Sequence, residues 1–417
     1  MRRGKEKPLR VVQACDLQAG GISSMILAVC ENLDREAVNF DYLVYRNQEE
    51  FEDRRVQALG GRKLVASNTD AANKFEKFFY KFFRTYRVLR QERAEIFHIN
   101  ASTPYDCLVG LAARLAGVRT VILHAHNSRP EKSGKGHLVF QNICRMFQPL
   151  CGDRYFACSN LANEFMYGSR RRKKAVLVKN GIDTRRFQFD ETVRRQMRKR
   201  YGIQDALVVG HIGRLCPQKN QGFLIQIFAE LRKLRKDARL VLIGQGELER
   251  ELMDQVERLE LQDSILYIPV TSQPEQFYCM MDLFLLPSLY EGLPVVGVEA
   301  QASGLPCIFS DSITRELSIT DRAHYLSLEQ SPVEWAEQAV TLAGAAAALY
   351  LMFFNSMILQ LLQEGVSLGG RRGLTFTVHD SPLTILISVL WRYVGYLLPM
   401  AFCHGCHIAL PLAVITG

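Results

Sequence analysis

Two glutamates near the middle of the second half have the types and spacing to bind the hydroxyl groups of an elongated ligand. Glu291 and Glu299 lie eight residues apart within the segment 287–306. A helix over this segment would separate them by roughly 12 Å along its axis. They could then accept hydrogen bonds from a sugar at one end of a ligand and a ribose at the other. The structural alternative is a helix-capping Glu291 and a surface Glu299.

The residues after Glu291 predict a place for phosphate. Gly292 permits a tight turn, and the following residues to Ser303 have the pattern of a helix. The first amides of a helix lack partners inside it and carry partial positive charge, so they bind anions. We therefore expect a diphosphate at this helix N-terminus.

A cationic turn precedes this segment. Arg214 and Lys219 lie in the stretch 213–220, after an expected strand and before an expected helix. Arginine offers paired N–H donors and lysine a compact charge, and both suit phosphate oxygens. The spacing differs from that of a Walker A loop. One such turn, taken alone, is by default an ordinary solvated loop.

The first half holds weaker candidates. The adjacent Gly20 and Gly21 follow the first expected strand and allow close approach of the backbone to a ligand. His124 ends another strand and could hydrogen-bond a hydroxyl or polarise a leaving group, although a pair such as His124 and His126 is more often structural. No third ligand of suitable type stands nearby, so we predict no metal site.

An alternation of strands and helices positions these residues. Short runs rich in Val, Ile and Leu, separated by helices, are typical of parallel sheets buried on both faces. The turn 180–183 and the charged helix 191–201 after it mark a boundary, so we predict two Rossmann-like domains with ligands at the carboxyl ends of their strands. The expected strands are 9–14, 40–45, 95–99, 120–124, 154–158 and 175–178, then 206–212, 239–243, 264–268, 282–286 and 306–309.

The composition changes again near residue 343. Residues 341–417 contain five charged side chains, and the stretches 343–363 and 382–402 approach the roughly 20 apolar residues that span a bilayer. A fused segment or a shifted reading frame is favoured over a membrane anchor. The Cys-x-x-Cys-His spacing at 403–407 is that of haem attachment, but no export signal accompanies it, so chance is the favoured explanation.

Charge is unevenly distributed. The 417-residue chain has a formal net charge of +9, with a basic surplus of 17 in residues 1–200 and an acidic surplus of 8 in the remainder. This favours an anionic partner for the first half. The 11 scattered cysteines fit a reducing compartment. The composition excludes a wholly disordered, collagen-like or coiled-coil protein.

The stretch 74–93 combines aromatic residues at helical spacing with flanking lysines and arginines. Two interpretations stay open: a helix on a membrane surface, or a helix that packs its aromatics on the sheet. The basic run 170–174 favours an anionic surface. A lipid-diphosphate acceptor on the inner leaflet would account for it, and no nucleic-acid-binding module is evident.

Taken together, the motifs resemble the group 1 glycosyltransferases of family 4, which are retaining enzymes of the GT-B fold, and in particular bacterial enzymes of capsular and exopolysaccharide assembly. The likeness covers roughly residues 8 to 340. It rests on the order and spacing of the whole set: Gly20-Gly21-Ile22, His124-Ala125-His126-Asn127, Asn180-Gly181-Ile182-Asp183 with Phe187, Gly213-Arg214 with Lys219, Gly244-Gln245-Gly246, and Glu291 through Glu299 to Pro306.

The resemblance implies an α/β chain of the GT-B fold, with two Rossmann-like domains whose parallel sheets face a central cleft. Residues 1–190 would form the acceptor-binding domain and residues 191–342 the nucleotide-sugar-binding domain, followed by the atypical apolar tail 343–417. Related enzymes end instead with helices that complete the second domain.

The resemblance also implies roles for individual residues. Arg214 and Lys219 would neutralise the diphosphate of a nucleotide-sugar, Glu291 would contact the transferred sugar, and Glu299 the ribose. The amides of Gly292 and Leu293 would cap phosphate or sugar groups. From the other domain, Gly20 and Gly21 would close over the donor, and His124 would touch the sugar beside the reacting carbon.

The implied reaction is transfer of a hexose from a nucleotide-diphosphate sugar, with UDP the expected nucleotide, to a lipid-linked or growing glycan in polysaccharide biosynthesis. It would proceed with retention and without a metal or other cofactor, because cations and a helix dipole stabilise the leaving group. The expected location is the cytoplasm, with peripheral attachment to the cytoplasmic face of the membrane. The alternatives are a non-catalytic or inactivated nucleotide- or glycan-binding module of the same fold, and a sugar-nucleotide epimerase.

Overall fold

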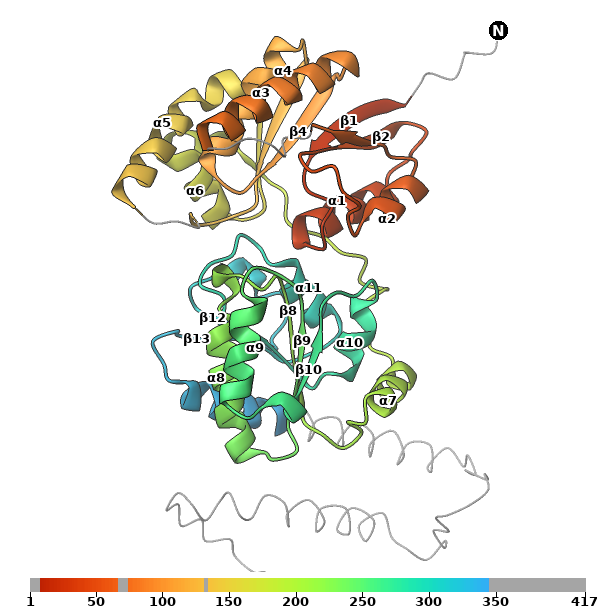
Figure 1. Ribbon diagram of the computed structural model, residues 1–417, viewed down its shortest axis with the longest axis vertical. Helices are drawn as coiled ribbons and strands as arrows, with labels where there is room; N and C mark the ends of the chain where they lie inside the picture. The colour runs from red at the N-terminus through yellow and green to blue at the C-terminus, as the bar shows by residue number, and fades with distance from the viewer. Residues whose placement is uncertain (1–7, 67–73, 131–133, 345–417) are drawn as a thin grey trace, which may run out of the picture. The chain divides into compact units, whose positions relative to one another are not determined.

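The computed structural model describes residues 8–66, 74–130 and 134–344 (Figure 1). The chain through Ala343 is one compact unit that contains two separate parallel sheets. The expected division at residue 190 lies inside this unit and stays a prediction. The predictions for the apolar tail and for the Cys-x-x-Cys-His motif fall outside the described residues.

The first sheet has seven strands in the order β3-β2-β1-β4-β5-β6-β7, and every neighbouring pair is parallel. Its central strands are continuous apolar runs because helices cover both faces. The carboxyl ends of β1, β4 and β5 lie side by side, since Gln13 pairs with His98 and Asn100 with His124. The strands are β1 (Leu9–Ala14), β2 (Val38–Val44), β3 (Lys63–Val65), β4 (Ile96–Ala101), β5 (Thr120–Ala125), β6 (Arg154–Ala157) and β7 (Val176–Leu177).

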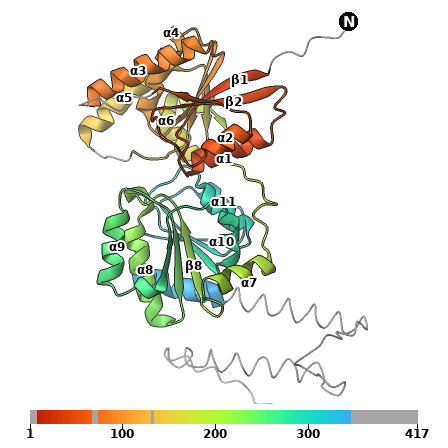
Figure 2. The ribbon, with the colours of Figure 1, turned by 45° about the vertical axis from the view of Figure 1, so that its right-hand side comes forward.

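The helices around this sheet form two groups. Figures 1 and 2 show α1 and α2 beside β1 and β2, whereas α3, α4 and α5 lie together, with α4 in contact with both of the others. We call this sheet with its helices the first lobe. Its helices are α1 (Gly21–Glu31), α2 (Asp53–Ala58), α3 (Lys74–Gln91), α4 (Val109–Leu115), α5 (Lys135–Cys151) and α6 (Asn160–Arg171), with single turns η1 (Pro104–Leu108) and η2 (Arg172–Lys174).

The second sheet has six parallel strands in the order β10-β9-β8-β11-β12-β13. We call it, with its helices, the second lobe. Its strands are β8 (Val208–Ile212), β9 (Arg239–Ile243), β10 (Ile265–Ile268), β11 (Leu283–Leu286), β12 (Cys307–Ser310) and β13 (Ala323–Leu326). Its helices are α7 (Glu191–Arg200), α8 (Gln221–Leu234), α9 (Glu249–Arg258), α10 (Pro274–Met280), α11 (Val295–Ala302) and a helix over residues 332–344, with the short turns η3 (Pro217–Lys219), η4 (Gln262–Ser264) and η5 (Arg315–Leu317).

All 11 expected strands are present, with ends that differ by a few residues, and the prediction of two parallel sheets is confirmed. Two strands were missed, β3 and β13, and each lies at the edge of its sheet. β3 is only three residues long and begins with a lysine, and β13 reads Ala-His-Tyr-Leu with every side chain half-buried. Both strands therefore lack the continuous apolar run by which the other strands were predicted.

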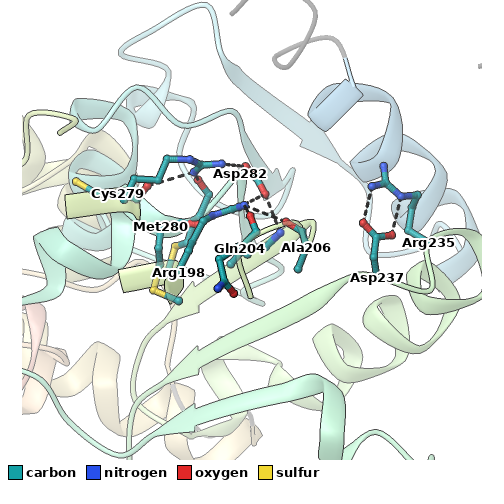
Figure 3. Close-up of polar contacts among 11 residues, drawn as sticks. Arg198, Gln204, Ala206, Arg235, Asp237, Cys279, Met280 and Asp282 are labelled. Atoms are coloured by element: carbon teal, nitrogen blue, oxygen red, sulfur yellow. Dashed lines mark hydrogen bonds and ion pairs between the residues drawn. The ribbon is translucent and has the colours of Figure 1, made fainter. Parts of the chain in front are cut away.

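The helix that opens the second lobe is anchored by arginines. Arg194 and Arg198 on α7 both donate to the carboxylate of Asp282, which also accepts the amide of Val208 at 2.8 Å (Figure 3). Arg198 Nε donates as well to the carbonyl of Met280 at 3.0 Å. Because Asp282 immediately precedes β11, these bonds tie α7 to the amino-terminal end of the second sheet, opposite the end where ligands bind.

None of the helices in residues 8–66, 74–130 and 134–344 is long and apolar enough to cross a membrane.

Candidate active site

A cavity of about 480 Å³ is lined by residues of both lobes. A second cavity of about 570 Å³ adjoins it and shares Val295 and Glu299 with it. Of the predicted site residues, seven line the first cavity together: Gly20, Gly21, Arg214, Lys219, Glu291, Leu293 and Glu299. His124 and Gly292 are not among its lining residues.

The most tightly held pair in this cavity joins Lys219 to Glu291. Lys219 Nζ lies 2.6 Å from Glu291 Oε1, and Gln218 Nε2 donates to Glu291 Oε2 at 3.2 Å. The short turn η3 presents Gln218 and Lys219, and Asn220 ends it in the left-handed conformation that asparagine tolerates. Both ion-pair partners are largely buried, so removal of either one would leave an uncompensated charge.

Glu291 is not part of a helix. Helix α11 begins at Val295 with Pro294 as its N-cap, so the predicted helical spacing between Glu291 and Glu299 was wrong. The capping alternative was wrong too, because no side chain caps this helix. Proline is favoured at the start of a helix, since its fixed φ suits the first turn and no N–H is lost there. Residues 291–293 are therefore left as a loop that reaches into the cavity.

Glu299 is buried on α11. Its Oε2 accepts a hydrogen bond from the Tyr278 hydroxyl at 2.9 Å. Burial raises the pKa of this carboxyl to about 7, and the Tyr278 hydrogen bond opposes part of that rise. The surface alternative for Glu299 was wrong. A buried carboxyl that lines a cavity and keeps acceptor capacity can bind the hydroxyl groups of a ligand.

Arg214 lies at the rim of the cavity, with 62% of its side chain exposed and an ion pair to Glu247 at 3.0 Å. The turn that carries it packs backbone against backbone on the loop after β9. A Cβ on Gly244 would lie 1.9 Å from the Gly213 carbonyl oxygen, and one on Gly246 would lie 2.2 Å from that of Leu215. These two glycines therefore allow the loop after β9 to pack directly against the backbone of the cationic turn.

Two helix N-termini meet in the cavity. Helix α1 begins at Gly21, with Gly20 as an extended N-cap and no capping side chain. A Cβ on Gly21 would lie 3.5 Å from Val295 Cγ2, so the first turns of α1 and α11 are in contact across the lobes. Both first turns line the cavity. Their uncapped amides and partial positive charges suit an anion.

Gly292 serves the contact between the lobes. The chain bends at this residue, but its φ is not positive, so the bend itself does not require glycine. A Cβ at this position would lie 2.1 Å from the carbonyl oxygen of His126 and 2.9 Å from Cys158 Sγ, both in the first lobe. The next residue, Leu293, accepts a hydrogen bond from Asn180 Nδ2 at 2.6 Å through its carbonyl. Only glycine fits where the loop 291–293 meets the first lobe.

The structure places the two histidines of the motif 124–127 in different surroundings. His124 is only 2% exposed and lies within β5, which continues to Ala125, whereas His126 follows the strand and lines the cavity. His124 is therefore not among the side chains that line the cavity, and its expected place beside the reacting carbon stays a prediction. The one signal for His126 in the sequence was its place in the same motif, because strand alternation does not say where a strand ends.

A buried polar network stands behind His126. Its Nε2 lies 3.0 Å from Asn100 Oδ1, and Asn100 Nδ2 donates to Gln13 Oε1 at 3.1 Å. His124 Nδ1 lies 3.2 Å from His98 Nε2, with the two rings stacked. Burial lowers the pKa of His98 to about 3 and of His124 to about 4, and it lowers the pKa of His126 as well. These imidazoles are therefore neutral at pH 7.

In residues 8–66, 74–130 and 134–344, no three or more His, Cys, Asp or Glu side chains gather as metal ligands would. The expectation of a metal-free reaction stays a prediction.

Comparison with known proteins identifies the family of this chain. Residues 19–186 match the family described as Glycosyltransferase Family 4, and residues 193–338 match Glycosyl transferases group 1. The chain is 33% identical over 362 residues to "Putative glycosyltransferase EpsF" of Bacillus subtilis (strain 168), covering 84% of this chain and 90% of that protein.

A second relative is "UDP-Gal:alpha-D-GlcNAc-diphosphoundecaprenol alpha-1,3-galactosyltransferase" of Escherichia coli, 31% identical over 54% of this chain and 60% of its own. Among solved structures, Anabaena Alr3699/HepE in complex with UDP and glucose superimposes with a TM-score of 0.67 at 17% identity, covering 85% of this chain and 99% of that one. The chain is a glycosyltransferase of the GT-B fold, and it belongs to the group 1 glycosyltransferases of family 4.

Proposed function

We propose that the chain transfers a hexose from a UDP-sugar to a lipid-linked or growing glycan in polysaccharide biosynthesis, with retention of configuration at the anomeric carbon. One observation carries the proposal. Arg214, Lys219, Glu291 and Glu299 line a single cavity, together with two uncapped helix N-termini. Cations and amides suit a diphosphate, and two carboxylates suit the hydroxyl groups at its two ends.

In this proposal, the diphosphate lies between Arg214, Lys219 and the first turn of α11. Arg214 exchanges its exposed ion pair with Glu247 for one with phosphate, an exchange that costs little because exposed pairs contribute little. Lys219 stays beside Glu291 and gives the second cation. Positive charge at the leaving diphosphate then comes from side chains and helix dipoles, which supports a reaction without metal.

The two carboxylates bind the two sugars of the donor. Glu291 accepts a hydroxyl of the transferred hexose, held in orientation by Lys219 and Gln218. Glu299 accepts the ribose hydroxyls from its buried place on α11. The choice of UDP is supported by HepE, whose structure holds UDP and glucose, and by the Escherichia coli relative, whose name specifies UDP-Gal.

The first lobe supplies uncharged groups that contact the donor. The backbone at Gly20 and Gly21 covers the donor, and the uncharged His126 faces the sugar in the place once expected for His124. An acceptor hydroxyl attacks the anomeric carbon from the face that the diphosphate leaves. The bond from that carbon to the phosphate oxygen breaks, and the departing phosphate takes the acceptor's proton.

A lipid-linked acceptor places the enzyme in the cytoplasm, at the inner face of the membrane. The diphosphoundecaprenol acceptor named for the Escherichia coli relative supports this part of the proposal.

The test begins with a thermal-shift screen of nucleotide-sugars, since a ligand at about 100 Kd stabilises by roughly 2.7 kcal/mol. Transfer of radiolabelled sugar to a lipid extract follows. We expect Glu291→Ala to lower transfer by about 100-fold or more, and Arg214→Ala to weaken donor binding about tenfold. The matched control is Glu247→Gln, which breaks the ion pair of Arg214 outside the cavity and should change transfer less than about twofold.

Unchanged transfer in both Glu291→Ala and Arg214→Ala would defeat the proposal. Conversion of the donor without any acceptor would identify an epimerase. Binding of UDP without transfer to any acceptor would identify a binding module.

A further inference from the structure

A row of polar side chains crosses one face of the first sheet, near the carboxyl ends of its central strands. Gln13 on β1 pairs in register with His98 on β4, and Asn100, two residues further along β4, pairs with His124 on β5. Since side chains two residues apart share a face of a strand, all four lie on the same side of the sheet. Gln13 and His124 are buried. Buried polar groups are costly unless they are hydrogen-bonded, so the bonds within this row fix how its members are oriented.

The amide of Asn100 has a fixed orientation in this row. Its Nδ2 donates to Gln13 Oε1 at 3.1 Å and to the carbonyl oxygen of Ala14 at 3.4 Å. A backbone carbonyl can only accept, so the amide nitrogen has to face Ala14 and the amide oxygen has to face away from it. That oxygen, Oδ1, lies 3.0 Å from His126 Nε2. Because Oδ1 can only accept, Nε2 carries the proton of the neutral His126 ring.

The bond to Asn100 leaves the other ring nitrogen of His126 as an acceptor. A neutral imidazole has one N–H and one lone pair, so the lone pair is on Nδ1. Within the part of the chain that the structure describes, Nδ1 makes no hydrogen bond and is accessible to solvent. The ring packs against that of His124, with 4.1 Å between the two centroids, and the His126 amide donates to the Ala101 carbonyl at 3.0 Å. The position of this acceptor is therefore fixed by ring, backbone and amide together.

We propose that Asn100 is a positioning residue, which holds His126 in the tautomer that accepts a hydrogen bond from a hydroxyl group of the transferred hexose. The inference rests on the proposed function, in which Glu291 accepts another hydroxyl of that sugar. The loop that carries Glu291 packs on His126, since a Cβ on Gly292 would lie 2.1 Å from the His126 carbonyl oxygen. His126 and Glu291 therefore line one cavity at neighbouring places.

The tautomer decides which groups of a nucleotide-sugar His126 can bind. With its lone pair on Nδ1, the ring accepts from a sugar hydroxyl and offers nothing to an anion. With the proton on Nδ1, the same nitrogen would donate, and phosphate oxygens are strong acceptors. It would then compete with Arg214 and Lys219 for the diphosphate. Asn100 therefore keeps His126 selective for the sugar.

The first experiment is heteronuclear NMR of the full chain with isotope-labelled histidine, which distinguishes protonated from unprotonated ring nitrogens without any substrate. The spectrum of His126→Gln assigns the His126 signals. At about pH 8, where imidazole is neutral, the wild type should carry the proton on Nε2. Asn100→Leu would leave a buried Nε2–H without an acceptor, so the proton should move to Nδ1. Asn100→Asp keeps an oxygen beside Nε2 and should keep the wild-type tautomer.

Transfer kinetics then connect the tautomer to the reaction. Asn100→Leu should lower kcat/KM about fivefold to tenfold, because one oriented hydrogen bond to the sugar is lost. In a His126→Gln background the same change should lower kcat/KM by less than about twofold, because its effect passes through His126. The matched control is Gln148→Leu, which removes another buried amide of the first lobe, one that donates to the Met166 carbonyl at 2.9 Å. It should leave kcat/KM within about twofold of the wild type.

A wild-type spectrum with the proton on Nδ1, or an unchanged tautomer in Asn100→Leu, would overturn the proposal. So would a full effect of Asn100→Leu in the His126→Gln background, since Asn100, which also lines the cavity, would then act on the substrate directly. If Asn100→Leu does not fold, Gln13→Leu replaces it, because Gln13 orients the Asn100 amide, and it should give a mixture of the two tautomers. The tautomer is measured without donor or acceptor, so the expected spectrum beside absent transfer would count against the proposed function alone.

Discussion

The two lobes contribute different chemistry to one cavity. Both cations in its lining, Arg214 and Lys219, belong to the second lobe, whereas the charged lining residues of the first lobe in the described chain are the acidic Asp16 and Glu52. The remaining polar groups of the first lobe there are uncharged, with His126 neutral because burial lowers its pKa.

This difference separates two tasks. Under the proposed function, an anionic diphosphate is attracted to the cations of the second lobe and to the amides at the start of α1, and it is repelled by the two acidic side chains of the first lobe. The other lining side chains of the first lobe are neutral, and these can bind hydroxyl groups. The proposed function uses this difference: the charged donor would lie against the second lobe, and an uncharged acceptor hydroxyl would approach from the first.

The largest expected effect comes from a substitution that disrupts the contact between the two lobes. Gly292→Ala would place a Cβ 2.1 Å from the His126 carbonyl oxygen, so the loop or the lobe has to move. Overpacking of this kind costs about 1–3 kcal/mol, and we expect kcat/KM for transfer to fall about tenfold to 100-fold. Gly20→Ala is the matched control for stability, because its Cβ would meet no protein atom closer than 3.9 Å. Wild-type kinetics in Gly292→Ala would show that the close approach is dispensable.

Much of this arrangement could be predicted from the sequence. Most strands of both sheets are short apolar runs, shorter than most helices. Residues that follow such strands collect at one edge of a parallel sheet. Arg214, Lys219, Glu291 and Glu299 were placed together on that basis, and they line one cavity.

What could not be predicted depends on contacts between distant segments. The need for glycine at 292 comes from His126, which lies in the other lobe. The start of α11 was misjudged because Pro294 moved it past Glu291. In α3 the periodic pattern left open what the aromatic residues contact, and the helix exposes Phe79, Tyr80 and Phe83 while it buries Thr85 and Leu89.

A smaller expected effect tests the uncharged groups of the first lobe and distinguishes His126 from His124. We expect His126→Gln to lower kcat/KM about tenfold, since one oriented hydrogen bond in the transition state is worth about 1–2 kcal/mol. His124→Gln should instead lower the free energy of unfolding by about 1–3 kcal/mol, because His124 is buried among His98 and Phe156 and does not line the cavity. Kinetics and chemical denaturation of both variants give the comparison. Lost transfer in a stable His124→Gln protein would restore the role first expected for His124.

The smallest expected effect is a pH dependence of stability that arises from Glu299 in the second lobe. The folded pKa of Glu299 is about 7, above its ordinary value of 4.5, because burial disfavours the carboxylate. The unfolded chain therefore loses this proton first, so the free energy of unfolding falls as pH rises from about 4.5 to about 7 and this contribution is constant above that range. Glu299→Gln should lack that part of the slope in urea denaturation.

Ligand binding should change in the opposite direction over the same range. Ribose hydroxyls donate to the ionised carboxylate, so affinity for a UDP-sugar should rise a few-fold between about pH 6 and about pH 8. The buried histidines of the first lobe titrate well below this range, since burial lowers their pKa values. Titration calorimetry of the wild type and Glu299→Gln at both pH values isolates the effect. If the glutamine variant shows the same rise, Glu299 is not the group that binds the ribose, and the donor lies elsewhere along the second lobe.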